Sequence, residues 1–195
     1  MSDNLAIEPA KTALLAMDYQ LGIVAGYASD QQNLLGRTAS LLTAARKAGI
    51  AIIYIVVGFR PGYAEVSARN LSFSAIRQSG RFLPSDPGTA IHRDLAPAEG
   101  DIVITKHRVS AFAGTDLEMI LRAKGVDHLL LAGIATGGVV LSTTRHAADA
   151  DYRITIIRDC CSDRDDEVHR VLMEKVFPRQ ATVITAAEFL AALGA

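Results

Sequence analysis

Asp18, Lys106 and a glycine-rich turn are the groups in this sequence best suited to chemistry. Asp18 directly follows the apolar run Thr12–Met17, and Lys106 follows the run Ile102–Thr105. The turn Gly133–Gly138 follows a third apolar run, residues 129–132. A carboxyl group and an amine that lie close together shift each other's pKa and can exchange protons with a substrate. These residues therefore predict a small-molecule site of an enzyme.

The apolar runs that carry these groups alternate with helical patterns along the chain. The sequence predicts strands over residues 12–17, 50–57, 102–105, 128–132, 153–158 and 181–184, and helices over about 30–49, 116–124, 138–150, 165–176 and 186–193. Such alternation predicts a three-layer, Rossmann-like α/β fold, with a mainly parallel six-stranded sheet and helices on both faces. The carboxyl ends of parallel strands meet at one crevice, so Asp18, Lys106 and the turn are expected to converge there.

The segment 58–100 is interrupted by proline and glycine and predicts a long loop with short helical turns. Such a loop acts as a lid, a pocket wall or a subunit contact. Aromatic residues in or beside it either wall an apolar pocket, pack the loop down or meet another subunit: Phe59, Tyr63, Phe73, Phe82 and Phe112. Three arginines are candidates for recognising a substrate carboxylate, or are simply solvated: Arg60, Arg77 and Arg108.

Composition restricts the class of protein. With 195 residues, 50% of them hydrophobic and 21% charged, the chain predicts one globular domain over residues 1–195. The net charge of −1 gives no attraction to nucleic acid, and no apolar stretch is long enough for a membrane span. The two cysteines are the neighbours Cys160 and Cys161, which cannot join distant segments. We therefore expect a cytoplasmic protein with a small-molecule substrate and neither nucleic acid nor membrane as partner.

Several motifs resemble the isochorismatase-like hydrolase family of the cysteine hydrolase superfamily, over nearly the whole chain. They are Asp18-Tyr19-Gln20, Lys106, the turn Gly133–Thr136 and the following Val140–Thr143 with Arg145-x-Ala147. The resemblance implies that Asp18 and Lys106 are catalytic, that the peptide bond near Ala135-Thr136 is cis, and that backbone N–H groups of the turn form an oxyanion hole. The residues expected to bind substrate are Gln20, Phe59, Thr136, Gly137, Gly138 and Val139. We also expect a homodimer or homotetramer.

The chain departs from the cysteine-dependent members at the position of the nucleophile. Those members carry Thr-Asp-x-Cys-Val, where this sequence has Thr136-Gly137-Gly138-Val139-Val140. Valine cannot attack a carbonyl group. The branch that hydrolyses isochorismate also lacks this cysteine, so we expect hydrolysis by acid–base chemistry at Asp18 and Lys106. The alternative is a catalytically silent homologue that binds a small molecule or serves as a structural subunit.

Other residues leave alternatives open or predict no site. The nicotinamidases of this family place a metal-binding Asp-x-His after the second strand, where this chain has Val57–Arg60, so no metal or other cofactor is expected. Gly137 and Gly138 serve either close packing or the binding of an anion. Thr136 and Ser142 lack a visible activating partner, and Cys160 and Cys161 are either inert filler or a displaced thiol.

Overall fold

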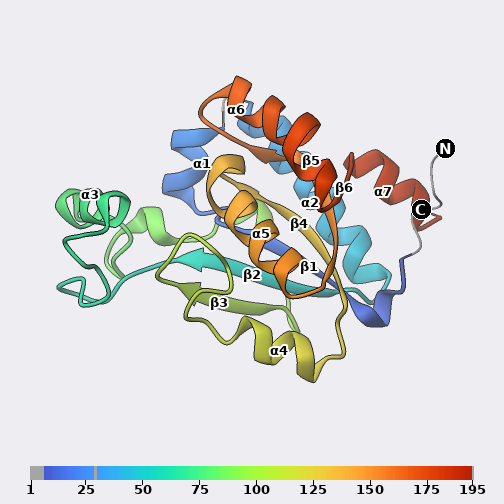
Figure 1. The fold of residues 1–195 in the computed structure, drawn as a ribbon, viewed down its shortest axis with the longest axis horizontal. Coiled ribbons are helices and arrows are strands. Elements are labelled where there is room, and N and C mark those ends of the chain that lie inside the picture. The colour runs from blue at the N-terminus through green and yellow to red at the C-terminus, as the bar shows by residue number, and fades with distance from the viewer. Residues whose placement is uncertain (1–6, 29, 195) are drawn as a thin grey trace.

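Six parallel strands form a single sheet in the structure, a computed structural model that describes residues 7–28 and 30–194. The strand order is β3-β2-β1-β4-β5-β6, and every neighbouring pair is parallel, as the alternating pattern predicted. The strands are β1 (Thr12–Met17), β2 (Ala51–Val57), β3 (Ile102–Lys106), β4 (His128–Ile134), β5 (Arg153–Ser162) and β6 (Thr182–Ile184). The α/β fold is thereby confirmed (Figure 1).

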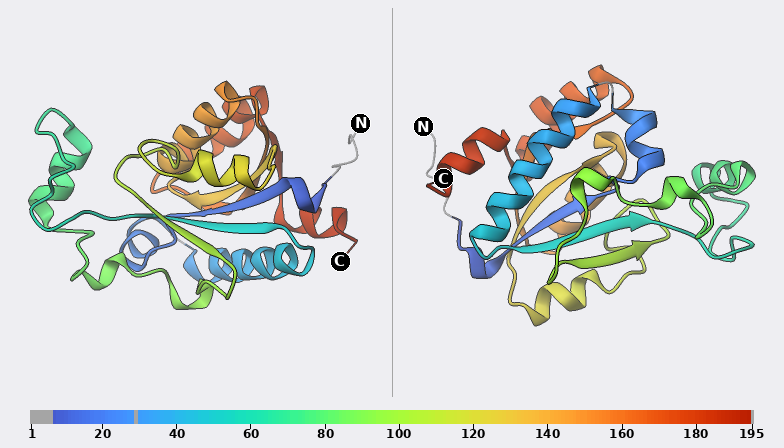
Figure 2. Two further views of the ribbon diagram at one scale, coloured as in Figure 1. Left: turned by 90° about the horizontal axis from the view of Figure 1, so that it is seen from below. Right: turned by 180° about the vertical axis from the view of Figure 1, so that it is seen from behind.

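Helices cover both faces of the sheet. They are α1 (Leu21–Tyr27), α2 (Gln31–Lys47), α3 (Leu71–Ser79), α4 (Leu117–Ala123), α5 (Leu141–Asp149), α6 (Asp166–Val171) and α7 (Ala186–Ala192). Alternate residues of β1 enter two separate cores: Leu14 packs with α1, α2 and α7, whereas Leu15 packs with α4 and α5. The left view of Figure 2 shows the sheet between α2 on one side and α5 on the other. None of the described helices is long and apolar enough to cross a bilayer.

The segment between β2 and β3 contains one helix that the sequence pattern did not predict as a regular element. Helix α3 begins after Asn70, whose side chain accepts the N–H of Phe73 at 3.1 Å, and ends at Gly80 with φ of 68°. The helix and its flanking loops project from the body of the molecule (Figure 1). The segment then returns to the sheet, where the His92 N–H donates to the Tyr19 carbonyl at 2.8 Å. It therefore lies beside the carboxyl end of β1.

Some boundaries differ from the sequence prediction. Helix α1 was missed, because its N-cap Gln20 makes no capping hydrogen bond and its sequence carries no helix-start signal. The predicted helix 138–150 begins with a wider turn, Thr136–Val140, before α5. The predicted helix 165–176 likewise changes from α6 to a wider turn after Val171.

Strand β5 is longer than predicted and ends at Ser162 rather than residue 158. The register of β4 against β5 shifts between Leu131 and Gly133, and the pairing then continues with Gly133 opposite Cys161. Cys160 and Cys161 therefore lie inside the strand and not after it. Their side chains are buried in opposite cores of the sheet.

Candidate active site

Asp18 stands at the carboxyl end of β1, in the middle of the sheet. Its backbone has φ of 59°, a left-handed conformation that aspartate and asparagine tolerate better than most residues. The Asp18 N–H donates to the Ile55 carbonyl of β2 at 2.8 Å, which fixes this turn of the chain. The side chain is buried and lines a cavity of about 210 Å³.

Lys106 reaches Asp18 from the edge of the sheet. It is the last residue of β3 and pairs in register with Val57 of β2, so one strand separates it from β1. Its Nζ lies 2.9 Å from Asp18 Oδ2, and the two side chains are only 3% and 7% exposed. Strands far apart in the sequence thus bring an acid and an amine together in one cavity, as the sequence predicts from their strand-end positions.

The environment of Asp18 makes its carboxyl a weaker acid than that of an exposed aspartate. Burial raises the pKa of the carboxyl above its ordinary value, and the charge and hydrogen bond of Lys106 offset only part of this effect. The second carboxyl oxygen, Oδ1, is buried and has no hydrogen-bond partner among the described residues. Asp18 therefore takes up a proton more readily than an exposed aspartate, and Lys106 stabilises the carboxylate when the proton is given away.

The turn after β4 forms part of the wall of the same cavity. Ala135, Gly138 and Val139 line the cavity, with Val139 2% exposed. The peptide bond between Ile134 and Ala135 is cis, one residue before the position that the resemblance implied. Gly138 has φ of −102° and ψ of −105°, outside the helical region, so the chain bends there before α5. Gly138 and Val139 are thus the two turn residues of the predicted substrate site that reach the cavity.

Two further residues predicted to bind substrate lie outside the cavity lining. The Thr136 hydroxyl is buried and lies 2.8 Å from Nδ1 of His169, and the Gly137 N–H donates to Asp163 Oδ2 at 2.6 Å. His169 is thus the partner of Thr136 that sequence spacing did not reveal. Because the N–H of Gly138 donates to the Ala135 carbonyl at 3.0 Å, neither glycine N–H is left free for an oxyanion. The two glycines therefore hold the turn in place, which favours the packing interpretation over the anion site.

Gln20 and Phe59 hold segments next to the site in place and are absent from the cavity lining. The Gln20 amide donates to the Val57 and Thr89 carbonyls at 2.8 and 2.7 Å, and its oxygen accepts the Val57 N–H. Both amide hydrogens are therefore used, and Gln20 ties the segment after β2 to the sheet. Phe59 is buried and packs edge-on against Phe73, with ring centroids 5.7 Å apart. Phe73, not Phe59, faces the cavity.

The segment 58–100 contributes the residues of the cavity that sequence reasoning identified least well. Phe73 and Phe82 line it, as two of the five aromatic candidates, and Arg81 lines it in place of the three arginines considered from the sequence. Helix α1 supplies Tyr27. No periodic pattern marks such residues, because an irregular segment has no fixed face.

Neither cysteine lies in the lining of this cavity. Cys160 and Cys161 are buried in β5, and desolvation raises the pKa of the Cys160 thiol to about 12 and that of Cys161 further. A thiol with such a pKa carries almost no thiolate near neutrality. Within residues 7–28 and 30–194, no group of three or more His, Cys, Asp or Glu side chains could hold a metal ion.

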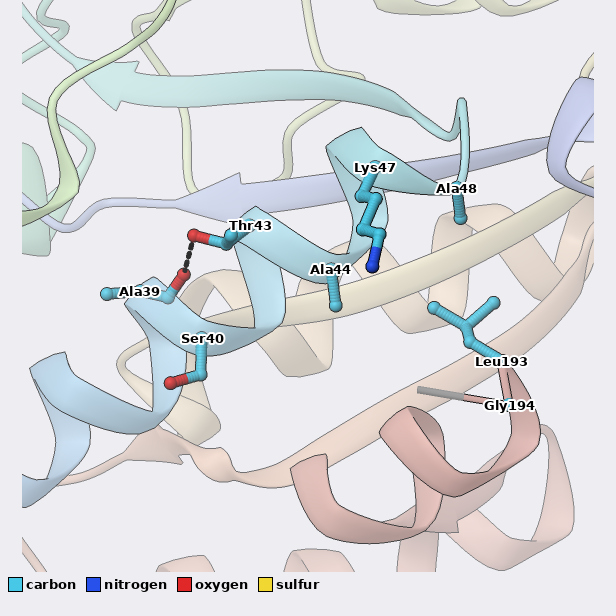
Figure 3. Close-up of a pocket in the computed structure, with 8 residues that line it drawn as sticks. All are labelled: Ala39, Ser40, Thr43, Ala44, Lys47, Ala48, Leu193 and Gly194. Atoms are coloured by element: carbon cyan, nitrogen blue, oxygen red, sulfur yellow. Dashed lines mark hydrogen bonds between the residues drawn. The ribbon is translucent and has the colours of Figure 1, made fainter.

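A larger hollow of about 650 Å³ lies between α2 and α7 (Figure 3). Its lining contains small and apolar residues, two hydroxyl groups and one charged side chain, Lys47. Lys47 has no acidic partner in this lining, so the hollow offers no pair of groups for acid–base chemistry. The smaller cavity at Asp18 and Lys106 is therefore the candidate active site.

Comparison with known proteins identifies the family of the chain. The family model described as the isochorismatase domain matches residues 12–188. The chain belongs to the isochorismatase family. A second isochorismatase family protein, YwoC of Bacillus subtilis, is 34% identical over 190 residues, which cover 97% of this chain and 98% of YwoC. A maleamate amidohydrolase of Pseudomonas putida is 26% identical over 179 residues, 90% of this chain and 83% of that enzyme.

Solved structures of the isochorismatase family show the same fold. An isochorismatase family protein from Burkholderia thailandensis superposes with a TM-score of 0.83 and 29% identity, covering 97% of this chain and 98% of the other. Hydrolysis of small metabolites is the activity class of this family, as its matched domain and its amidohydrolase relatives indicate. The match extends over β1 to β6 and therefore includes every strand that positions the cavity.

Proposed function

We propose that this isochorismatase family protein hydrolyses a small metabolite by acid–base chemistry at Asp18 and Lys106, with water as the attacking group. The observation that carries this proposal is the buried Asp18–Lys106 pair, 2.9 Å apart in a cavity that Val139 also lines. By the resemblance of the motifs, Val139 occupies the position of the nucleophilic cysteine in the cysteine-dependent members. A valine side chain offers no nucleophile. The two cysteines are excluded as substitutes because burial holds them outside the cavity as neutral thiols.

The raised pKa of Asp18 suits it to act as a general acid. With an enol ether as substrate, Asp18 gives its proton to the terminal carbon of the double bond, and the cation that forms is shared with the ether oxygen. Water adds to that cation and returns one proton to the Asp18 carboxylate. The resulting hemiketal separates into an alcohol and a carbonyl compound, so the net reaction consumes one water. Lys106 stabilises the Asp18 carboxylate between the two proton transfers.

The test is turnover of enol ethers, primary amides and ureido compounds by the wild-type protein and by Asp18→Asn. Asparagine tolerates the left-handed backbone of position 18 and cannot donate an acidic proton. A general acid typically contributes about 10² to 10⁴-fold, so we expect enol-ether turnover to fall by at least about 100-fold. Asp94→Asn is the matched control, because Asp94 is an exposed aspartate outside the cavity lining. It is expected to keep wild-type turnover.

Other outcomes would decide against this mechanism. Amide or ureido turnover that survives Asp18→Asn would require a different nucleophile or base, in line with the activity of the amidohydrolase relatives. Thermal stabilisation by members of the panel without any turnover would instead show a small-molecule-binding homologue. Val139→Cys tests whether the geometry of the site suits amide hydrolysis. New amidase activity in this variant would show that the cavity has amidase geometry and lacks only the thiol.

The expected oligomer and location belong to the same proposal. We propose a homodimer or homotetramer, in the cytoplasm, consisting of one domain over residues 1–195. Light scattering on the purified protein measures the oligomeric state directly. A monomeric mass at micromolar concentration would contradict it.

A further inference from the structure

We propose that Arg81 selects substrates that carry a carboxylate, and that the guanidinium binds this group while the reacting bond lies at Asp18 and Lys106. This inference rests on the function proposed for the cavity and adds the substrate class. The reason lies in the charged groups of the lining, which are Asp18, Lys106 and Arg81. Asp18 and Lys106 neutralise each other at 2.9 Å, whereas Arg81 leaves a positive charge in the cavity.

Arg81 has no carboxylate within ion-pair distance among the residues that the structure describes. Within the described part of the chain its side chain makes one hydrogen bond, from Nη2 to the Gly22 carbonyl at 2.6 Å. Asp86 is near enough for Arg81 to contribute to lowering its pKa, but the Asp86 oxygens accept the N–H groups of Phe82 and Gly88 at 2.8 Å. A guanidinium has five N–H donors, so most of those of Arg81 remain available to a ligand.

The guanidinium is held in place before any ligand arrives. Its central carbon lies 4.8 Å from the centroid of the Phe82 ring, and the Tyr63 hydroxyl donates to the Arg81 backbone carbonyl at 2.7 Å. Gly22 of α1 makes room for it, since a Cβ at that position would lie 2.8 Å from Nη2 of Arg81. A fixed guanidinium loses little freedom on binding and can meet both oxygens of a carboxylate at once.

The remaining lining defines the rest of the ligand. Between the charged groups the walls are mainly apolar, with Ile23, Phe73, Phe82 and Val139 among them. A volume of about 210 Å³ admits only a small molecule. The geometry therefore suits a short carboxylic acid with an apolar or unsaturated middle and a hydrolysable bond at its other end.

The experiment is calorimetric titration of the full-length protein with carboxylates and their neutral counterparts, such as maleamate and maleamide or succinamate and succinamide. Binding is measured directly, so the result does not depend on turnover. For wild type we expect at least one carboxylate to bind tenfold or more tightly than its neutral amide. In Arg81→Met the Kd of this carboxylate is expected to rise at least about 30-fold, while the Kd of the neutral amide changes less than about threefold. Arg81→Lys is expected to recover only part of the difference.

Two further variants separate recognition from folding. Gly22→Ala is expected to weaken carboxylate binding by displacing the guanidinium, although Arg81 itself is unchanged. Arg77→Met removes an exposed arginine of α3 outside the cavity lining and is expected to have no effect. The inference is overturned if wild type prefers no carboxylate, if Arg81→Met weakens both ligands equally, or if Arg77→Met causes the same loss. Carboxylate selectivity without hydrolysis would refute the proposed activity and leave Arg81 as the selecting residue.

Discussion

Breaking the buried ion pair between Asp18 and Lys106 should cost far more stability than removing the whole pair. The charges lie 2.9 Å apart, and at an effective dielectric constant of about 20 their attraction is about 6 kcal/mol. Removing one partner leaves the other charge buried, which typically costs about 3–5 kcal/mol. We therefore expect Lys106→Met and Asp18→Asn each to lower the free energy of unfolding by about this amount at pH 7.

The double variant tests whether the two losses have this common cause. With both charges gone, neither position holds a buried charge that has lost its partner, and replacing a buried pair by neutral groups is often close to neutral. Asp18→Asn with Lys106→Met is therefore expected to lie within about 2 kcal/mol of wild type. The coupling between the two sites then amounts to several kcal/mol. An uncoupled pair would instead give a double variant that loses the sum of the single effects.

The pH dependence of the stability of Lys106→Met gives an independent test of the same reasoning. Removing Lys106 takes away the attraction that offsets burial, so the folded-state pKa of Asp18 rises further above its unfolded value. A carboxyl whose pKa is raised by folding lowers stability at pH above its unfolded pKa. The stability deficit of the variant should therefore shrink as the pH falls from 7 toward the unfolded-state pKa of aspartate, about 3.9. A deficit that stays constant over this range would point to lost packing and not to an unpaired carboxylate.

Urea unfolding followed by far-ultraviolet circular dichroism suits these measurements, because the chain has no tryptophan for fluorescence. Arg122→Met is the matched control. Arg122 pairs with Glu118 on the surface of α4, and the two side chains are 74% and 42% exposed. Exposed pairs of this spacing contribute about 0.3–0.5 kcal/mol. Single-variant losses at Asp18 and Lys106 that do not exceed this level would refute the reasoning.

Three further predictions concern the sheet and the turn after β4. Burial lowers the pKa of His128 to about 4, below its unfolded value of about 6.5, so unfolding takes up a proton between these pH values. The free energy of unfolding should therefore fall by up to about 3 kcal/mol as the pH drops from 6.5 to 4. The urea midpoint should depend less on pH in His128→Gln, and an equal pH dependence in the variant and wild type would contradict this. Gly133→Ala should lower the free energy of unfolding by about 1–3 kcal/mol, since its Cβ would lie 2.7 Å from a carbonyl oxygen of β1. The control is Gly36→Ala in α2, where the added Cβ meets open space, and the free energy of unfolding should rise by up to about 1 kcal/mol. Asp163→Ala should speed hydrogen exchange of the Gly137 N–H at least about tenfold, and unchanged exchange would show that the 2.6 Å hydrogen bond does not hold the turn.

The sequence was sufficient for the parts of this protein that depend on local patterns. Buried parallel strands need continuous apolar runs, so their number and near-correct ends could be read directly, as for β1 and β4. A charged residue placed directly after such a run must lie at the carboxyl edge of the sheet. This rule alone places Asp18 and Lys106 at that edge.

Features without a local signal were missed or misplaced. The uncapped helix α1 and the extension of β5 depend on tertiary contacts rather than on residue spacing. Gln20 was expected to touch substrate, yet the backbone of two other segments uses all its N–H groups. A motif gives residue types at a spacing, but it does not say which hydrogen-bond partners the rest of the chain will supply.

The sequence by itself determined the sheet, the family of motifs and the strand-end positions of the acid and the amine, because each follows from hydrophobic periodicity or from neighbours along the chain. Only the tertiary structure decided that Lys106 crosses over β2 to meet Asp18, that His169 and Asp163 hold the turn, and that Arg81 enters the cavity. These contacts join residues 26 or more positions apart. Their distances depend on how helices and loops pack against the sheet, which the spacing of residues along the chain does not encode.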